Sequence, residues 1–187
     1  MFRRLRLQFI TIASLAILFI LVFTVGIINT VRSFQTEQEI SKVLNTLTEN
    51  NGSFGKTKKI ETNQGHEIPL DSFRFFSVTL SGDKVVSQDT SHTSLIDDEE
   101  AVSYALAASR MTNTFGTIRE KNINLSYQVS KVSNNKILVV FLDTTSYYNS
   151  SQALLSLSIL LSLFGFIFFV VIVSALSCLL YTSDAAD

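Results

Sequence analysis

Two stretches of apolar residues without any charge stand near the two ends of the chain. Residues 9–28 contain no Asp, Glu, Lys or Arg, and neither do residues 153–176. A helix of about 20 apolar residues, rising ~1.5 Å per residue, crosses the ~30 Å hydrocarbon core of a bilayer. The pattern therefore predicts two transmembrane helices, at residues 9–28 and 153–176.

Residues 33–50 predict an amphipathic helix, because apolar side chains recur there at steps of three and four. No Gly or Pro separates this segment from the first apolar stretch, so we expect one helix to run from the first span into the central region. The polar residues 49–53 predict its end. Residues 55–65 are polar and lysine-rich, which is typical of an exposed loop. The apolar positions of the helix are Phe34, Ile40, Val43, Leu44 and Leu47.

Five segments of the central region are rich in aromatic and β-branched residues and predict strands. Residues 73–81 and 85–87 flank a Gly-Asp turn and predict a hairpin. Residues 125–132 and 136–143 flank a pair of asparagines in the same way, and residues 115–118 predict the remaining strand. Because the last segment is apolar at every position from 137 to 142, we expect it to be a central, buried strand.

A second helix is predicted from Asp97 to about Arg110. Asp is a residue type that caps helices, Glu100 follows three residues later, and Ile96 is placed to pack on Ala101. The element order is then helix, two strands, helix, three strands, helix. Its natural packing is an α+β domain, an antiparallel sheet with the helices on one side, placed between the two transmembrane helices.

Composition and charge narrow the class of protein further. Hydrophobic residues make up 47% of the 187-residue chain and charged residues 17%, and the mean hydropathy is +0.31. Residues 32–152 hold 12 Lys and Arg and 14 Asp and Glu. This near-balance argues against a nucleic-acid partner, which needs a clustered basic face. The only cysteine is Cys178, so we expect no disulfide in the central region.

The charges of the N-terminus predict the orientation. Arg3, Arg4 and Arg6 precede the first apolar stretch and favour a cytoplasmic position for residues 1–8. Residues 32–152 are then extracytoplasmic, in a multi-pass protein of the plasma membrane. A cleaved secretory signal is the alternative, but the apolar run exceeds a signal core of about 7–15 residues and no Ala-x-Ala-like site follows it.

The second predicted span carries two further features. Tyr147 and Tyr148 stand just before it, where aromatic residues favour the membrane interface. Small side chains on nearby turns either let a second helix approach closely or are simply tolerated in lipid. They are Ser158, Ser162 and Gly165.

The most conspicuous charged run is Asp97-Asp98-Glu99-Glu100. One interpretation is a surface that senses divalent cations or cationic peptides. Carboxylates in the first turn of a helix also complement its dipole and its free N–H groups, which is worth about 0.3–1 kcal/mol each. We expect the second, structural role.

Other candidate residues are isolated. His66 and His92 lie in polar segments without a second ligand at metal-binding spacing, whereas a metal site needs three or four ligands. The sequence has no phosphate-binding Gly-x-x-x-x-Gly-Lys loop, no His-Glu-x-x-His motif and no readable nucleophile–His–acid set. We therefore designate no catalytic, cofactor-binding or metal-binding residue. Asn-x-Ser sequences, which matter only in a eukaryotic secretory route, begin at Asn51, Asn124 and Asn149.

Four segments carry a family resemblance when they are taken together. They are the arginine-rich start with the first span; Phe75-Phe76-Ser77-Val78-Thr79-Leu80 with the turn and Val85-Val86-Ser87 after it; Asp98-Glu99-Glu100-Ala101-Val102-Ser103-Tyr104-Ala105; and Val139-Val140-Phe141-Leu142-Asp143 with a second span ending Val173-Ser174-Ala175-Leu176-Ser177. Residues 1–177 thereby resemble the N-terminal sensing half of a bacterial membrane sensor histidine kinase of the kind found in gut Firmicutes. The resemblance implies a PAS-like extracytoplasmic domain in a homodimer.

In that family the second span is followed by a basic linker, a phosphoacceptor helix with a His-Glu-x-Lys-Thr-Pro-like motif and an ATP-binding domain, none of which is in this sequence. The resemblance thus implies signal sensing and transmembrane signal transfer for a two-component histidine kinase. ATP and Mg²⁺ belong to the missing kinase core, the partner of that core is a response regulator, and the extracytoplasmic ligand is unknown. The alternatives are the sensor segment of a chemoreceptor or cyclic-dinucleotide enzyme, and a two-span binding or structural membrane protein.

Residues 178–187 resemble the translation of a sequencing-library transposon adapter. They read Cys-Leu-Leu-Tyr-Thr-Ser-Asp-Ala-Ala-Asp, with two acidic residues and no Lys or Arg. A short cytoplasmic tail is the alternative, although cytoplasmic flanks of spans are usually rich in Lys and Arg. We expect this segment to be non-native and exclude it from the fold.

Overall fold

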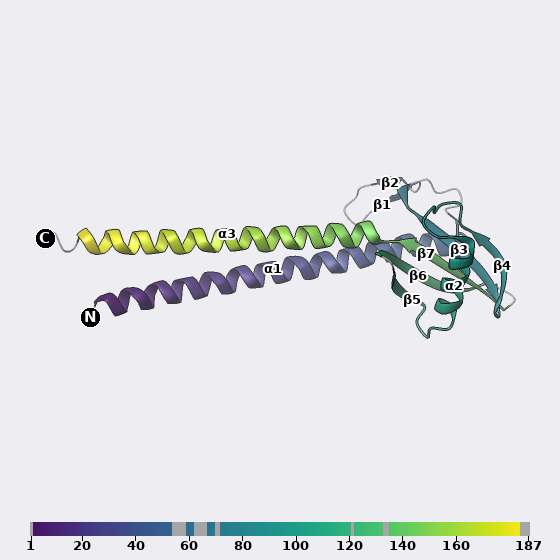
Figure 1. Ribbon diagram of the computed structural model, residues 1–187, viewed down its shortest axis with the longest axis horizontal. Helices are drawn as coiled ribbons and strands as arrows, with labels where there is room; N and C mark the ends of the chain where they lie inside the picture. Colours follow the sequence, from purple (N-terminus) through teal and green to yellow (C-terminus); the bar gives the residue numbers. More distant parts are fainter. Residues whose placement is uncertain are drawn as a thin grey trace. The chain divides into compact units, whose positions relative to one another are not determined.

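The computed structural model divides the chain into two units (Figure 1). The helical unit consists of Met1–Ser33 and Ser150–Asp187, and the sheet unit is Phe34–Asn149. The residues whose backbone the structure describes are 2–53, 59–61, 67–69, 72–120, 122–132 and 135–183.

Two long helices make up the helical unit, and each continues without a break into the sheet unit. They are α1, Phe2–Glu49, and α3, Thr145–Ser183. Both are long and apolar enough to cross a membrane, and they contain the predicted spans 9–28 and 153–176. Most of their large apolar side chains are exposed, so the chain itself does not cover this surface.

The end of α1 belongs to the core of the sheet unit, which confirms the predicted amphipathic helix. Its apolar side chains at positions 40, 43, 44 and 47 are buried. Phe34, which shares their spacing, is 62% exposed and is not part of the buried face.

A Schellman arrangement ends α1 where the polar residues predict a stop. The N–H of Asn51 donates to the C=O of Thr48 at 3.2 Å, and the N–H of Gly52 donates to the C=O of Leu47 at 2.8 Å. Asn51 and Gly52 both have a positive φ, which Gly adopts without strain and Asn tolerates better than most residues. These hydrogen bonds satisfy two carbonyl groups of the last turn of the helix.

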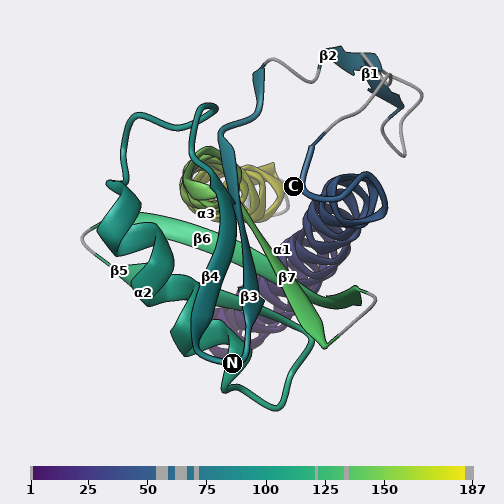
Figure 2. The ribbon, with the colours of Figure 1, turned by 90° about the vertical axis from the view of Figure 1, so that its right-hand side faces the viewer.

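The main sheet has five antiparallel strands in the order β4-β3-β7-β6-β5 (Figure 2). The first hairpin and the last strand thus meet at the centre, where the apolar run of residues 137–142 predicted a buried strand. All five predicted strands are confirmed, and so is the α+β class. The strands are β3 (Phe75–Ser81), β4 (Lys84–Asp89), β5 (Phe115–Glu120), β6 (Ile123–Val132) and β7 (Lys136–Asp143).

Helices cover both faces of this sheet, so the expectation of helices on one side is wrong. Alternate residues of β7 belong to two separate cores: Val140 packs in the core that contains the end of α1, and Phe141 packs in the core that contains α2 (Asp98–Ser109). The buried residues of α2 are the small side chains Ala101, Ala105 and Ala108. Because both faces of β7 are buried, it needs apolar residues at consecutive positions.

A small second sheet has one of its two strands inside the segment, residues 55–65, that the sequence predicts as an exposed loop. In it β1, Lys59–Glu61, pairs antiparallel with β2, Glu67–Pro69. The loop prediction for residues 55–65 is therefore wrong at 59–61, because strands of three residues are too short to produce a readable alternation. The other residues of that predicted loop lie outside the described part of the chain.

Candidate functional site

A polar pocket opens where β7 passes into α3. It has a volume of about 280 Å³, close to the lower end of the roughly 300–1,000 Å³ of small-molecule sites. Every residue of its lining belongs to the sheet unit, and all but one are polar. The pocket therefore suits a small polar molecule. It is lined by Ser72, Phe73, Arg74, Asp143, Ser146 and Tyr147.

Strand pairing brings the two charged residues of this polar pocket together. Phe75 of β3 pairs with Leu142 of β7, and one step further the N–H of Asp143 donates to the C=O of Arg74 at 2.9 Å. Residues directly opposite each other on antiparallel strands have Cβ atoms about 4.5–5.5 Å apart. Arg74 and Asp143 thus stand at one end of the sheet although they are far apart in the sequence.

Asp143 also lies next to the start of the last helix, α3. Its Oδ1 accepts the N–H of Thr145 at 2.9 Å, and the C=O of Thr144 accepts the N–H of Tyr148 at 3.1 Å. The N–H groups of the first turn have no acceptor within the helix and carry the positive end of its dipole. Ser146 and Tyr147, which line the polar pocket, both belong to this turn.

The charges of the polar pocket are not neutralised by each other. Arg74 is exposed and forms no ion pair with any described carboxylate, Asp143 included. Burial raises the pKa of the Tyr147 phenol, and the negative charge of Glu39 raises this pKa further. The phenol is therefore protonated at neutral pH and is available as a hydrogen-bond donor. The polar pocket thus presents a guanidinium, a phenol and a carboxylate.

The acidic run Asp97-Asp98-Glu99-Glu100 begins α2, as expected, but the cap differs from the prediction. Asp97 occupies the N-cap position and its C=O accepts the N–H of Ala101 at 2.9 Å, yet its side chain makes no capping hydrogen bond. The side chain of Asp98 does make a hydrogen bond, because its Oδ1 accepts the hydroxyl of Thr90 at 2.7 Å. Ile96 and Ala101 are buried in the same core, as their predicted packing requires.

The histidines do not meet. His66 lies outside the described residues, and the ring of His92 stacks on the ring of Phe75 with their centroids 4.4 Å apart. No group of three or more His, Cys, Asp or Glu side chains in the described part of the chain is arranged to hold a metal ion. His92 therefore acts as an exposed cover on a buried aromatic ring.

The tyrosines that precede the second apolar stretch pack on protein. Tyr147 and Tyr148 are partly buried against the core that contains the end of α1. The guanidinium carbon of Arg119 lies 5.2 Å from the centre of the Tyr148 ring, within the range of a cation–π contact. A role at the membrane interface stays a prediction.

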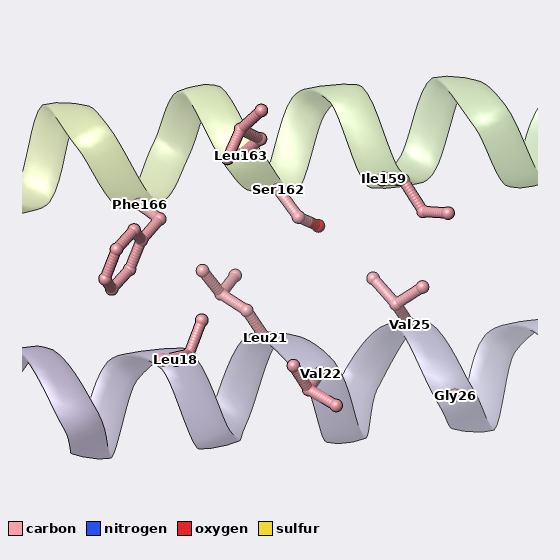
Figure 3. A pocket seen from close by; sticks show the side chains of 9 residues that line it. All are labelled: Leu18, Leu21, Val22, Val25, Gly26, Ile159, Ser162, Leu163 and Phe166. Atoms are coloured by element: carbon pink, nitrogen blue, oxygen red, sulfur yellow. The ribbon is translucent and has the colours of Figure 1, made fainter.

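An apolar pocket of about 410 Å³ lies between the two helices of the helical unit. Figure 3 shows Leu21 and Val25 of α1 pointing toward α3, and Ser162 of α3 pointing into the space between them. Of the small residues considered above, Gly165 is exposed, and a Cβ at this position would meet nothing within 4 Å. Only part of the predicted small-residue surface thus faces the other helix.

Comparison with models of protein families, with curated proteins and with solved structures finds no match for this chain. A functional assignment of this chain therefore rests on the geometry of its own residues.

Sequence reasoning missed the polar pocket, because its charged residues are isolated in the sequence. The pocket could have been found only from the pairing of β3 with β7, the first and the last strand of this sheet in chain order, which places Arg74 beside Asp143.

Proposed function

We propose that this chain is the membrane-anchored sensing part of a two-component sensor histidine kinase, with residues 32–152 forming a PAS-like domain on the extracytoplasmic side. The observation that carries the proposal is the continuity of both helices: α1 runs from an apolar stretch into the core of the sheet unit, and α3 leaves that unit and becomes an apolar stretch. A sensor that signals across a bilayer needs such a connection at each end of its domain.

The strand order supports the PAS-like part of the proposal. When the five strands β3 to β7 are numbered 1 to 5 in chain order, their order in the sheet is 2-1-5-4-3, which is the order of PAS-type sheets. The helix α2 connects β4 to β5, the second of these strands to the third. Fold alone does not fix function, so the output domain has to be established separately.

The same continuity suggests how a signal would travel. β7 is the central strand, and α3 begins two residues after it ends. A ligand that favours one packing of β7 against the end of α1 would shift one apolar helix relative to the other. It can do so only through its different affinities for the two packings. In this proposal ATP and Mg²⁺ act on the kinase core, which is not in this sequence, and the homodimer passes the phosphoryl group to a response regulator.

Reading the genomic coding sequence beyond the codon of Ser177 tests the proposal directly. We expect a basic linker and a His-Glu-x-Lys-Thr-Pro-like motif in the same frame. Long heptad helices or a Gly-Gly-Asp/Glu-Glu-Phe motif would assign the domain to a chemoreceptor or a cyclic-dinucleotide enzyme instead, and an immediate stop codon would contradict a signalling output. The same reading shows whether residues 178–187 are encoded in the genome.

Cysteine labelling tests the orientation. In a Cys178→Ser background, Ser94→Cys places a thiol on an exposed site of the sheet unit, and Phe2→Cys places one at the N-terminus. A membrane-impermeant thiol reagent on intact cells should label the first variant and not the second, while permeabilised cells should be labelled in both. Labelling of the N-terminal cysteine alone on intact cells would reverse the proposed topology.

A further inference from the structure

We infer that the polar pocket at the start of α3 binds a small zwitterion, a molecule or headgroup that joins an acidic anion to an ammonium group; a free α-amino acid is the simplest example. This inference rests on the proposed function, because it names the chemical class of the signal. It is carried by the composition of the polar pocket, which places on one small cavity a carboxylate and a guanidinium that pairs with no described carboxylate.

The anionic end of such a ligand has two sources of attraction. Arg74 is exposed and pairs with no described carboxylate, so its planar guanidinium is free to bind an acid group in two-pronged fashion. Ser146 and Tyr147 stand in the first turn of α3, where free N–H groups and the helix dipole favour negative charge. The protonated phenol of Tyr147 is a further donor.

The ammonium end is recognised by the carboxylate of Asp143. One of its oxygens, Oδ1, accepts the N–H of Thr145, and its position on the lining leaves the group available to a ligand. Glu39, whose negative charge acts on Tyr147, adds to the attraction for a cation in this region. An ammonium group hydrogen-bonded to a carboxylate is one of the stronger polar contacts in proteins.

Neither charge alone suits the polar pocket. A simple anion would be attracted by Arg74 but repelled by the negative charge of Asp143. A simple cation would be attracted by Asp143 but repelled by the positive charge of Arg74. The two residues do not neutralise each other by an ion pair, although they stand opposite each other on paired strands. A zwitterion satisfies both groups at once, and a volume of about 280 Å³ limits it to a small molecule or headgroup.

The test is calorimetric titration of the full chain in detergent with the common L-amino acids, one at a time. For any amino acid that binds, Arg74→Gln and Asp143→Asn should each weaken binding at least tenfold. Asn at position 143 keeps an oxygen that can cap α3, so the fold is retained. The matched controls are Arg110→Gln and Asp83→Asn, which make the same changes in an exposed ion pair, 3.3 Å long, between residues outside the lining of the polar pocket. These controls should leave the affinity unchanged.

Two analogues of the bound amino acid test the need for both charges. The carboxylic acid that lacks the amino group and the amine that lacks the carboxyl should each bind at least tenfold more weakly than the parent. If either analogue binds as tightly as the parent, the zwitterion class is wrong. Equal losses in the Arg110→Gln control and in Arg74→Gln would show that the polar pocket is not the binding site.

A zwitterionic lipid headgroup has the same chemistry, so O-phosphoethanolamine is titrated in parallel. Saturation by this probe, with the same sensitivity to Arg74→Gln, supports the site and assigns its source to the membrane, whereas saturation by amino acids alone assigns it to solution. If neither kind of probe binds the wild-type chain, the inference fails. That failure is distinct from failure of the sensor proposal, which depends on the coding sequence after Ser177 and not on this titration.

Discussion

Phe76 and Phe141 stack face to face across the neighbouring strands β3 and β7, with ring centroids 4.6 Å apart and planes 8° from parallel. They are partners in the register of β3 and β7, and Tyr127, the partner of Phe141 on β6, lies tilted at 5.8 Å from it. Tyr104 of α2 completes the cluster at 6.4 Å from Phe141. This aromatic row joins α2 to the strand that leads into α3.

Phe141→Ala should therefore destabilise the sheet unit strongly. Removing a fully buried aromatic side chain typically costs about 3–5 kcal/mol in unfolding free energy. The control is Val86→Ala on the edge strand β4, where the side chain is exposed and a cost within ~0.5 kcal/mol is expected. Denaturant unfolding of the full chain in detergent, followed by near-ultraviolet circular dichroism of the tyrosines, measures both. If both variants lose the same unfolding free energy, the aromatic row is not the centre of this core.

Gly52→Ala should be far more costly than Gly82→Ala. Both glycines have a positive φ, so a methyl group adds backbone strain of about 1–2 kcal/mol at either position. At Gly52 a Cβ would also overlap the side chain of Ser77 on β3, whereas at Gly82 it would meet nothing within 4 Å. We expect an additional loss of about 1–3 kcal/mol at position 52, typical of overpacking. Similar melting temperatures for the two variants would show that the end of α1 is not held against β3.

How far the sequence predicts this fold depends on the kind of signal. The apolar run of residues 137–142, the Gly82-Asp83 turn and the start of α2 are local signals, and each marks an element that the structure contains. The pairing of strands far apart in the sequence is not local. Nothing in the pattern around Phe76 or Val140 says that α2 covers one face and α1 the other, because both faces are simply apolar. The two-sided packing therefore had to come from the structure.

The acidic run is a local signal in the sequence, whereas the polar pocket is not. Four consecutive carboxylates stand out in a sequence, while Arg74 and Asp143 become neighbours only through strand pairing. The acidic run supplies the first turn of α2, where its charges need no ligand to explain them.

Asp97→Ala should cost little, in contrast to most N-cap substitutions. A side chain that caps a helix is typically worth about 1 kcal/mol, but the Asp97 side chain makes no such bond, so we expect a loss below about 0.5 kcal/mol. Asp98→Ala removes the hydrogen bond from the hydroxyl of Thr90 and should cost about 0.5–1.5 kcal/mol. Unfolding of both variants under the same conditions gives the comparison. A larger loss of stability in Asp97→Ala than in Asp98→Ala would show that the Asp97 side chain does cap the helix, as the sequence predicted.

Acid should weaken the turn that follows β4, through Asp89. The hydroxyl of Ser91 donates to Oδ1 of Asp89 at 2.6 Å and the N–H of Ser91 donates to the same oxygen at 3.1 Å. The hydroxyl bond is the main reason that the pKa of Asp89 lies below its ordinary 3.8; burial opposes it, and the N–H bond and the charge of His92 act in the same direction as the hydroxyl. A folded pKa below the unfolded one stabilises the fold at pH values above the unfolded pKa. This stabilisation is lost as the pH falls through the folded pKa.

Asp89→Asn should therefore lower the stability at neutral pH, and its difference from the wild type should shrink as the pH falls below about 4, the ordinary range of a carboxyl group. Ser91→Ala removes the main cause, so the pKa of Asp89 should return toward 3.8 in a carboxyl-carbon NMR titration. If Ser91→Ala leaves this pKa where it is in the wild type, the hydroxyl is not what holds the carboxylate. The stacking of His92 on Phe75 would then remain as the contact that fixes the turn.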